Sequence, residues 1–416
     1  MPAAPSKASL LVVFLTVFID LLGFGLVLPL LPIYADLPEF GADAAGWMIG
    51  GLMASFSVMQ FLCAPLWGRL SDRIGRRPVL MIGLGGSVVF YTLFGLASVW
   101  KSLPLLLASR IGAGTFGATI PTAQAYIADC TSLENRPKGM ALIGMAFGMG
   151  FTFGPLFGFL AVPAGHGDPG PGPGYAAAGL SAVALLLALF KLPESLRPGS
   201  QPAARKMLDF AALRAALATP SVGLILVSIF VCVFSFANFE TTISMLIKES
   251  QGLGSPFDFQ WREVCLTYAY IGLTLAIVQG GFVRRLAGRI HEGTLAAFGA
   301  LVQIFGFGLI TQSITAASTG MLLAALAVVV TGFAFMQPML NSLLSRRTDP
   351  RRQGGIFGIG QSASSLARIL GSLVGIPLLK MQTNLPFYVA AGLMSVGFLL
   401  VLTASRSGRD FAESAA

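Results

Sequence analysis

Long runs of apolar residues, separated by short polar segments, dominate the chain. A helix that spans a lipid bilayer needs about 20 mostly apolar residues, and the sequence holds twelve runs of roughly this length or longer. They cover residues 9–34, 44–67, 78–99, 102–128, 138–162, 174–192, 220–247, 261–283, 292–314, 319–345, 354–380 and 384–404. The pattern therefore predicts an all-α membrane protein with twelve transmembrane helices.

The composition agrees with the pattern. Charged residues make up 11% of the chain, against roughly 25% in an ordinary soluble domain, while hydrophobic residues make up 55% and the mean hydropathy is +0.78. These values exclude a soluble enzyme, whose surface must be rich in charge. We expect an integral, multi-pass protein whose first partner is the lipid bilayer.

The basic residues predict the orientation of the helices. If the N-terminus is cytoplasmic, the inside segments carry 21 Lys and Arg residues and the outside segments carry only 4. Cytoplasmic loops of membrane proteins hold an excess of Lys and Arg, so both termini are predicted to be cytoplasmic. The net charge of +9 arises in these loops, and we expect no nucleic-acid partner.

A proline-rich connection divides the helices six and six. We interpret residues 193–219 as a cytoplasmic linker between an N-terminal six-helix bundle, 1–192, and a C-terminal six-helix bundle, 220–416. A weak internal repeat supports this division. It relates two sets of residues with equal spacing: Arg136, Gly139 and Gly144 in the first half, and Arg352, Gly355 and Gly360 in the second. Repeated bundles with a site between them are typical of secondary transporters.

The loop after the second predicted helix has a distinctive order, Gly-Arg-Leu-Ser-Asp-Arg-Ile-Gly-Arg-Arg-Pro over residues 68–78. By composition alone it is a basic loop that sets topology. Its order closely resembles the G-x-x-x-D-R-x-G-R-R loop of the major facilitator superfamily. The resemblance implies an ion-pair latch between Asp72 and Arg73 that helps to hold the outward-facing state. The remaining latch residues implied are Gly68, Gly75, Arg76, Arg77, Asp129 and Arg136.

Three further motifs extend the resemblance over the N-terminal half. Arg110, Gly114 and Ala118 resemble the family's helix-4 motif, whose arginine is tied to proton coupling. The antiporter motif of helix 5 is matched by Gly150, Gly154, Pro155 and Gly158, although Phe159 stands where a second glycine is usual. The first helix, with Asp20, Gly23, Gly25, Pro29 and Pro32, is similar to that of twelve-helix drug/proton antiporters of the tetracycline-efflux type.

Four ionisable residues lie inside predicted helices: Asp20, Arg110, Glu240 and Arg368. An unpaired charge at the bilayer centre costs about 2.5–3.5 kcal/mol on insertion scales, so each should face a partner or a cavity. We expect Asp20 to pair with Arg110 and Glu240 with Arg368. A carboxylate whose distance to an arginine changes with conformation binds and releases a proton. The alternative is that these are static pairs that hold helices together.

Our hypothesis makes Asp20, modulated by Arg110, the main protonation site, with Glu240 as a second site or a substrate contact. Polar residues of helices 4, 7 and 10 are predicted to line the substrate cavity together with the four charges. These residues are Gln124, Asn238, Gln337 and Asn341. For any one of these amides, hydrogen bonding between helices is the competing interpretation.

These features predict a proton-coupled antiporter that exports a small amphiphilic compound or drug by alternating access. A symporter or facilitator for a metabolite, lipid or organic anion is the alternative within transport. A non-transporting receptor or scaffold is the alternative of another class, and an enzyme is not expected. The sequence shows no nucleotide loop or metal-ligand spacing, so we expect no cofactor. We also expect a monomer in a bacterial inner membrane.

Overall fold

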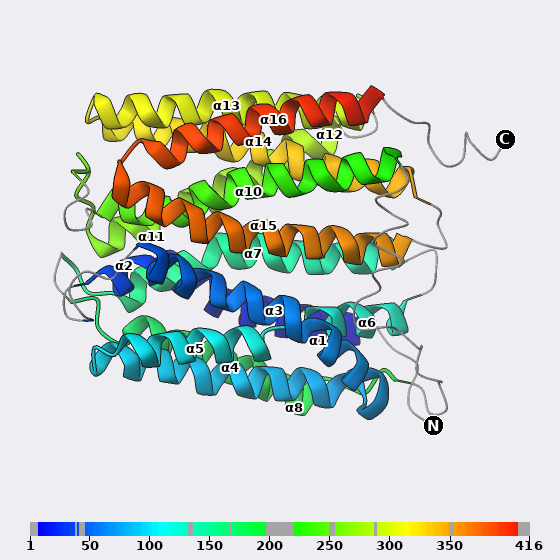
Figure 1. Ribbon diagram of the computed structural model, residues 1–416. Coiled ribbons are helices and arrows are strands. Elements are labelled where there is room, and N and C mark those ends of the chain that lie inside the picture. Colours follow the sequence, from blue (N-terminus) through cyan, green and yellow to red (C-terminus); the bar gives the residue numbers. More distant parts are fainter. Residues whose placement is uncertain are drawn as a thin grey trace. The chain divides into compact units, whose positions relative to one another are not determined.

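The computed structural model describes most of the chain as helix, and no β-strand occurs among the described residues (Figure 1). The described residues are 7–37, 40, 46–131, 136–165, 168–196, 220–248, 254–286, 289–348 and 353–406. Most of the predicted linker, 197–219, lies outside them, as do both chain ends.

The helices follow the predicted apolar runs closely. In the first part of the chain they are α1 Lys7–Val27, α2 Leu31–Asp36, α3 Gly46–Ile74, α4 Arg76–Val99, α5 Leu103–Phe116, α6 Ile120–Cys130, α7 Arg136–Ala161 and α8 Gly172–Lys191. In the second part they are α10 Pro220–Lys248, α11 Trp261–Ile277, the π-helix η2 Val278–Val283, α12 Arg284–Leu286, α13 Glu292–Thr315, α14 Thr319–Arg346, α15 Gln353–Met381 and α16 Leu385–Arg406.

Eleven helical segments of the described chain are long and apolar enough to cross a membrane. A shorter apolar helix, Gly148–Ala161, lies within the fifth predicted span. The all-α membrane architecture is thus confirmed, whereas the count of twelve and the cytoplasmic position of the termini stay predictions.

Proline breaks two spans that the apolar pattern predicts as continuous. Residues 28–30 form a turn between α1 and α2, and residues 117–119 form one between α5 and α6. A proline has no N–H, and its ring clashes with the carbonyl four residues earlier. Pro29 and Pro32 act in this way in the first break, and Pro121 acts in the second.

Side chains of α3 satisfy the carbonyls that the second break leaves open. Pro121 cannot donate to the carbonyl of Gly117, and Gln60 Nε2 donates to that oxygen at 3.5 Å. Trp67 Nε1 donates to the carbonyl of Thr115 at 2.6 Å. Backbone groups in a bilayer have no water to bond, so these two side chains stabilise the break.

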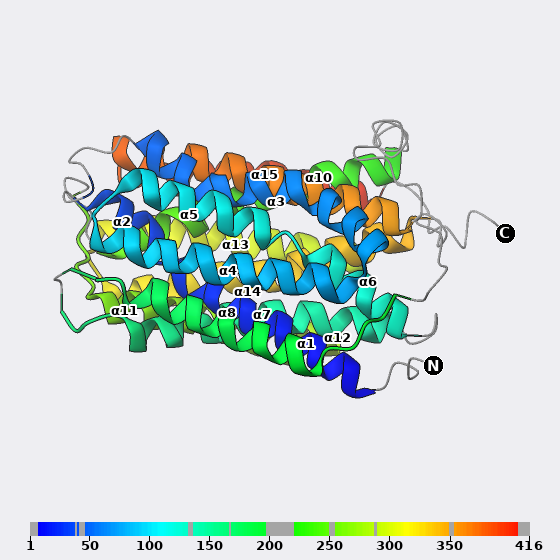
Figure 2. The same cartoon turned by 90° about the horizontal axis from the view of Figure 1, so that it is seen from below.

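The described chain forms two compact units. Unit 1 comprises the described residues within 1–44, 55–207 and 259–272, and unit 2 comprises those within 45–54, 208–258 and 273–416. In unit 1, α1 packs against α7 and α8, and α4 packs against α5 and α8 (Figure 2).

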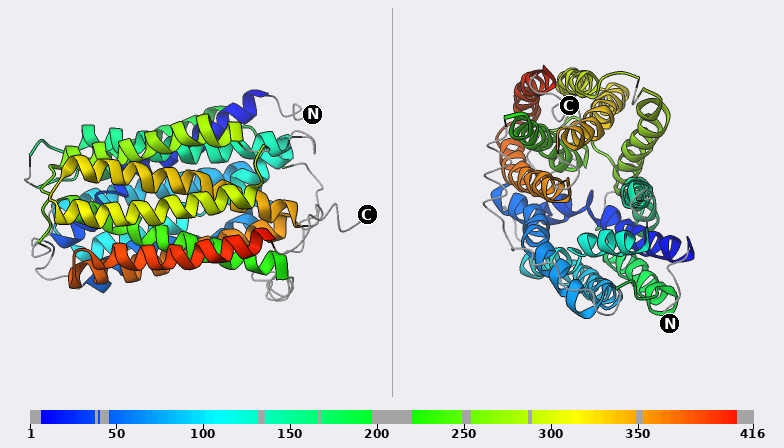
Figure 3. Two further views of the ribbon diagram at one scale, coloured as in Figure 1. Left: turned by 90° about the horizontal axis from the view of Figure 1, so that it is seen from above. Right: turned by 90° about the vertical axis from the view of Figure 1, so that its right-hand side faces the viewer.

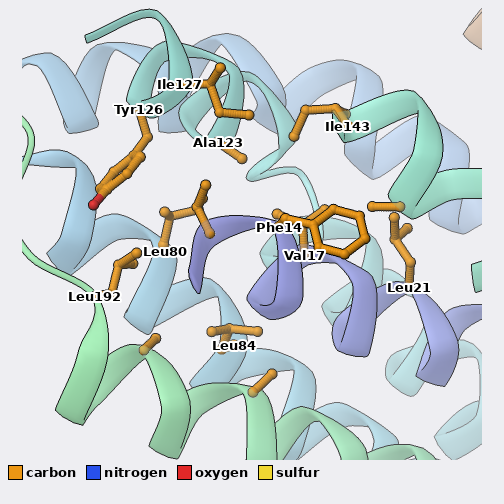
Figure 4. Packing of buried hydrophobic residues seen from close by; sticks show 14 residues of the cluster. Phe14, Val17, Leu21, Leu80, Leu84, Ala123, Tyr126, Ile127, Ile143 and Leu192 are labelled. Carbon is orange, nitrogen blue, oxygen red and sulfur yellow. The ribbon is translucent and has the colours of Figure 1, made fainter. Parts of the chain in front are cut away.

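Apolar side chains of five helices form part of the core of unit 1. Phe14, Val17 and Leu21 of α1 meet Leu80 and Leu84 of α4, together with residues of α6, α7 and α8 (Figure 4). All are buried, so this cluster fixes α1 against α4 beside the position of Asp20.

In unit 2, α10 packs against α15 and α16, and α13 packs against α14 and α16. The three helices α13, α14 and α16 lie side by side in Figure 3. Glycine permits the closest approaches. The Gly299 and Gly332 backbones of α13 and α14 are so near that a methyl group on either would lie 2.5 Å from the other's carbonyl oxygen.

Candidate functional site

Asp20 lies two turns before the end of α1 and is held by hydroxyl groups. Ser181 Oγ of α8 donates to Asp20 Oδ1 at 3.2 Å, and the Ser87 hydroxyl of α4 forms a second hydrogen bond to the carboxylate. Both serines are almost fully buried, with 0% and 3% of their surface exposed, whereas Asp20 is half-buried. The three helices α1, α4 and α8 thus converge on this carboxylate.

Arg110 of α5 is buried, with 2% of its surface exposed, and it stacks over the ring of Phe56 at 4.5 Å. Its Nε has no hydrogen-bond acceptor in the described part of the chain. Gly114, one turn later, allows the approach: a methyl group there would lie 2.5 Å from the Phe56 carbonyl oxygen. The helix-4 motif therefore serves to bring α3 against the arginine.

The structure does not show the direct Asp20–Arg110 pair that the sequence led us to expect. No ion pair joins the two side chains among the described residues. Instead Tyr91 of α4, which is 4% exposed and one turn after Ser87, lies within electrostatic reach of both. The apolar pattern could not reveal this, because Tyr91 is neither charged nor part of a recognised motif.

In unit 2, Arg368 of α15 lies within electrostatic reach of Glu240 of α10, and their pairing stays a prediction. Glu240 is half-buried and Arg368 is exposed. α10 and α15 pack along their length, so the two residues come from neighbouring helices.

The four predicted cavity amides lie in different surroundings. Gln124 is exposed, while Gln337 and Asn341 are half-buried. Asn238 is fully buried: its Oδ1 would lie 2.6 Å from a methyl group on Gly375 of α15. Neither polar atom of the Asn238 amide has a partner among the described residues.

The latch forms with a different arginine from the predicted one. Arg76, not Arg73, contacts Asp72, at 2.5 Å, and also reaches Asp129 at 3.2 Å. Arg76 donates to Ser71 Oγ as well, at 2.7 Å. Arg73 is exposed on the last turn of α3. Asp72 lies in the last turn of α3 and Arg76 is the first residue of α4, so this contact crosses the turn at Gly75 between the two helices.

Glu194 binds the loop that carries the predicted latch, and our sequence reasoning missed it. Its carboxylate accepts hydrogen bonds from the backbone N–H groups of Arg76 and Arg77, at 2.9 and 3.1 Å. These are the first two residues of α4, whose N-terminus carries partial positive charge. Gly75 before them has a φ of 109°, a conformation that favours glycine. The available signal was a carboxylate following the sixth predicted helix.

Three further residues belong to the predicted latch. Arg77 donates through its guanidinium to the Leu189 carbonyl at 2.6 Å, which ties α4 to the end of α8. Arg136 begins α7, and its side chain lies outside the described part of the structure. Gly68 lies in the interior of α3, where a methyl group would meet nothing within 4 Å.

The glycines of the helix-5 motif hold α7 against α1. A methyl group on Gly154 would lie 2.7 Å from the carbonyl carbon of Gly25, and one on Gly150 would lie 2.8 Å from Leu21 Cβ. A methyl group on Gly158 would lie 3.2 Å from the Sγ of Cys265. Pro155 sits inside α7, next to this contact. Small residues at four-residue spacing allow such close helix pairs in membranes.

Among the described residues, no group of His, Cys, Asp or Glu could hold a metal ion.

Comparisons with known proteins agree with this architecture. The model of the Major Facilitator Superfamily matches residues 13–372. The chain is 30% identical to "Major facilitator superfamily domain-containing protein 10" of Bos taurus over 98% of this chain and 95% of the relative. It is also 30% identical to "Tetracycline resistance protein, class C" of Escherichia coli over 89% of each.

A solved structure described as the human organic anion transporter MFSD10 (TETRAN) is similar over 96% of this chain and all of that one, with 28% identity and a TM-score of 0.71. The relatives come from mammals and from bacteria. They do not support a bacterial inner membrane over another membrane, so that location stays a prediction.

Proposed function

Because the chain belongs to the major facilitator superfamily, and is thus a multi-pass membrane transporter and not an enzyme, we propose that it is a proton-coupled antiporter. Its cargo is a small amphiphilic compound or drug, which it exports by alternating access, with residues 1–192 and 220–416 as its two halves. The tetracycline resistance relative supports this choice of cargo.

The observation that carries the proposal is the setting of Asp20. Its carboxylate lies in the interior of a membrane helix, half-buried, with hydroxyl partners, and no arginine of the described residues contacts it directly. A carboxylate without a counter-charge in a bilayer is costly when ionised and takes up a proton easily. Movement of Arg110 toward or away from it would release or bind that proton.

A proteoliposome experiment tests the coupling. An imposed pH gradient drives a panel of cationic, neutral and anionic compounds through wild-type protein, the Asp20→Asn variant and the Glu240→Gln variant. Asp20→Asn should abolish pH-driven movement but keep exchange of labelled for unlabelled cargo. Full pH-driven transport by Asp20→Asn would refute the assignment of Asp20. If the Glu240→Gln variant loses binding of cationic compounds but keeps binding of the neutral and anionic ones, Glu240 is a substrate contact.

A second candidate is the transport of organic anions. Arg110 is buried without an acceptor for its Nε, and a bound carboxylate or sulfonate would supply one. The similar structure named as an organic anion transporter favours the same class. The same panel of compounds tests this candidate with the Arg110→Gln variant. If anion uptake falls while cation uptake is unaffected, the result supports anion transport. An equal loss for every compound would favour a role of Arg110 in proton coupling.

A further inference from the structure

The partners of Asp20 are the two buried hydroxyl groups of Ser87 and Ser181, although an arginine is available on a neighbouring helix. These serines are contributed by α4 and α8, which pack against each other, and α8 also packs against α1. Neither serine is a short-range neighbour of Asp20 in sequence, and Ser181 is 161 residues away. Their convergence is therefore a property of the fold.

The direction of the hydrogen bonds determines their effect. A serine hydroxyl can donate one proton, and Ser181 Oγ donates to Asp20 Oδ1. Donors to a carboxylate stabilise its ionised form, because the protonated form is a weaker acceptor. Two such donors lower the proton affinity of the carboxyl group without supplying a charge.

The other groups facing Asp20 do not replace the serines. From α4, Tyr91 lies within electrostatic reach of Asp20 and also of Arg110 of α5. α7 carries no ionisable side chain from Gly139 to Ala161, and the ionisable residues of α8 are at its ends, Tyr175 and Lys191. On α6 the ionisable residues are Tyr126, Asp129 and Cys130, near its last turn.

We propose that Ser87 and Ser181 are positioning residues of the proton site. Their hydroxyl groups hold the ionised Asp20 carboxylate between α4 and α8 and tune how readily it takes up a proton. This inference rests on the proposed function, since it describes the same site. It adds that two hydroxyl groups, together with the position of Arg110, set how strongly Asp20 holds its proton.

The test is an infrared titration of purified protein, which follows the C=O stretch of the protonated Asp20 carboxyl against pH. The band is assigned by its loss in Asp20→Asn. In Ser87→Ala/Ser181→Ala we expect the midpoint to move to higher pH by about one unit, a roughly tenfold gain in proton affinity. Ser87→Thr and Ser181→Thr retain the hydroxyl group and should stay near the wild-type midpoint.

Ser98→Ala is the matched control. Ser98 is also on α4 and buried, with 1% exposed, but its hydroxyl donates to the Phe94 carbonyl at 3.0 Å. This variant should titrate like wild type. An unchanged midpoint in the folded double alanine variant would overturn the inference, and so would an equal shift in Ser98→Ala.

The titration needs no transport, so the two proposals can fail separately. A midpoint that shifts as expected, in a protein whose transport ignores an imposed pH gradient, would refute proton coupling but not the role of the serines. If transport follows the pH gradient but the midpoint does not shift in the double alanine variant, the role of the serines is refuted and proton coupling is not.

Discussion

Replacing Gly154 by alanine should separate two helices of unit 1. The new Cβ would lie 2.7 Å from the carbonyl carbon of Gly25, 2.8 Å from its Cα and 2.9 Å from the Leu22 carbonyl oxygen. Ordinary contacts begin at 3.4 Å, so α1 and α7 would have to part by roughly 0.7 Å at this point. All three atoms belong to the backbone of α1 and cannot turn away as a side chain would.

Gly148 provides a matched control on the same helix. A methyl group at Gly148 would meet nothing within 4 Å, and alanine is favoured over glycine in a helix by about 1 kcal/mol. This propensity gain applies to both variants and cancels in their difference. Overpacking costs about 1–3 kcal/mol, so Gly154→Ala should be less stable than Gly148→Ala by about that amount.

Thermal unfolding with a thiol-reactive fluorescent dye would measure this difference. Cys63, Cys232 and Cys265 are buried and free, so they react only as the protein opens. The unfolding midpoint changes by about 2–4 °C per kcal/mol in domains of 150–250 residues. Gly25→Ala, whose Cβ would lie 2.6 Å from the Gly150 carbonyl oxygen, should behave like Gly154→Ala. Equal midpoints for Gly154→Ala and Gly148→Ala would refute the reasoning.

Three further predictions concern the ends of the helices, and the same unfolding assay measures all of them. Glu194→Ala should cost about 0.5–2 kcal/mol, as loss of an N-terminal cap does, and Glu194→Gln should cost less; equal losses would contradict the capping role. Arg76→Ala should lower the midpoint more than Arg73→Ala, which should stay within about 0.5 kcal/mol of wild type, and the reverse order would mean that Arg73 closes the latch. Partial burial raises the pKa of Asp168, but hydrogen bonds from Lys101 and the Gly170 N–H, together with the Lys101 charge, hold that pKa below its ordinary value. The pair therefore stabilises the protein at neutral pH and loses its effect as the pH falls through the lowered pKa. Asp168→Asn should cost at most about 1 kcal/mol at pH 7 and nothing in strong acid; a loss that persists in acid would exclude the ion pair as its cause.

The apolar runs were sufficient to predict the helical spans because the bilayer sets their minimum length. They could not predict the break at residues 117–119, since the run stays apolar through it. The signal was Pro121, whose effect is on the backbone and is invisible to a count of hydrophobic residues.

Charged partners were harder to predict than helices. The contact of Arg76 with Asp72 depends on the turn at Gly75, which separates α3 from α4, so helical spacing did not identify Arg76 as the partner. The serines around Asp20 lie far from it in sequence, and serine is common in membrane helices. Only the packing of α1, α4 and α8 identifies Ser87 and Ser181, among the many serines of the membrane helices, as partners of Asp20.

The bonds from Gln60 and Trp67 to the broken fourth span have a consequence for how the sequence can change. A substitution at Pro121 that straightens α5 and α6 into one helix would give the carbonyls of Gly117 and Thr115 partners within that helix. The side-chain amide of Gln60 and the indole N–H of Trp67, both on α3, would then lose their hydrogen-bond acceptors inside the membrane. The break and its donors should therefore be inherited as a set, and changes at either helix should be tolerated only when the other changes too.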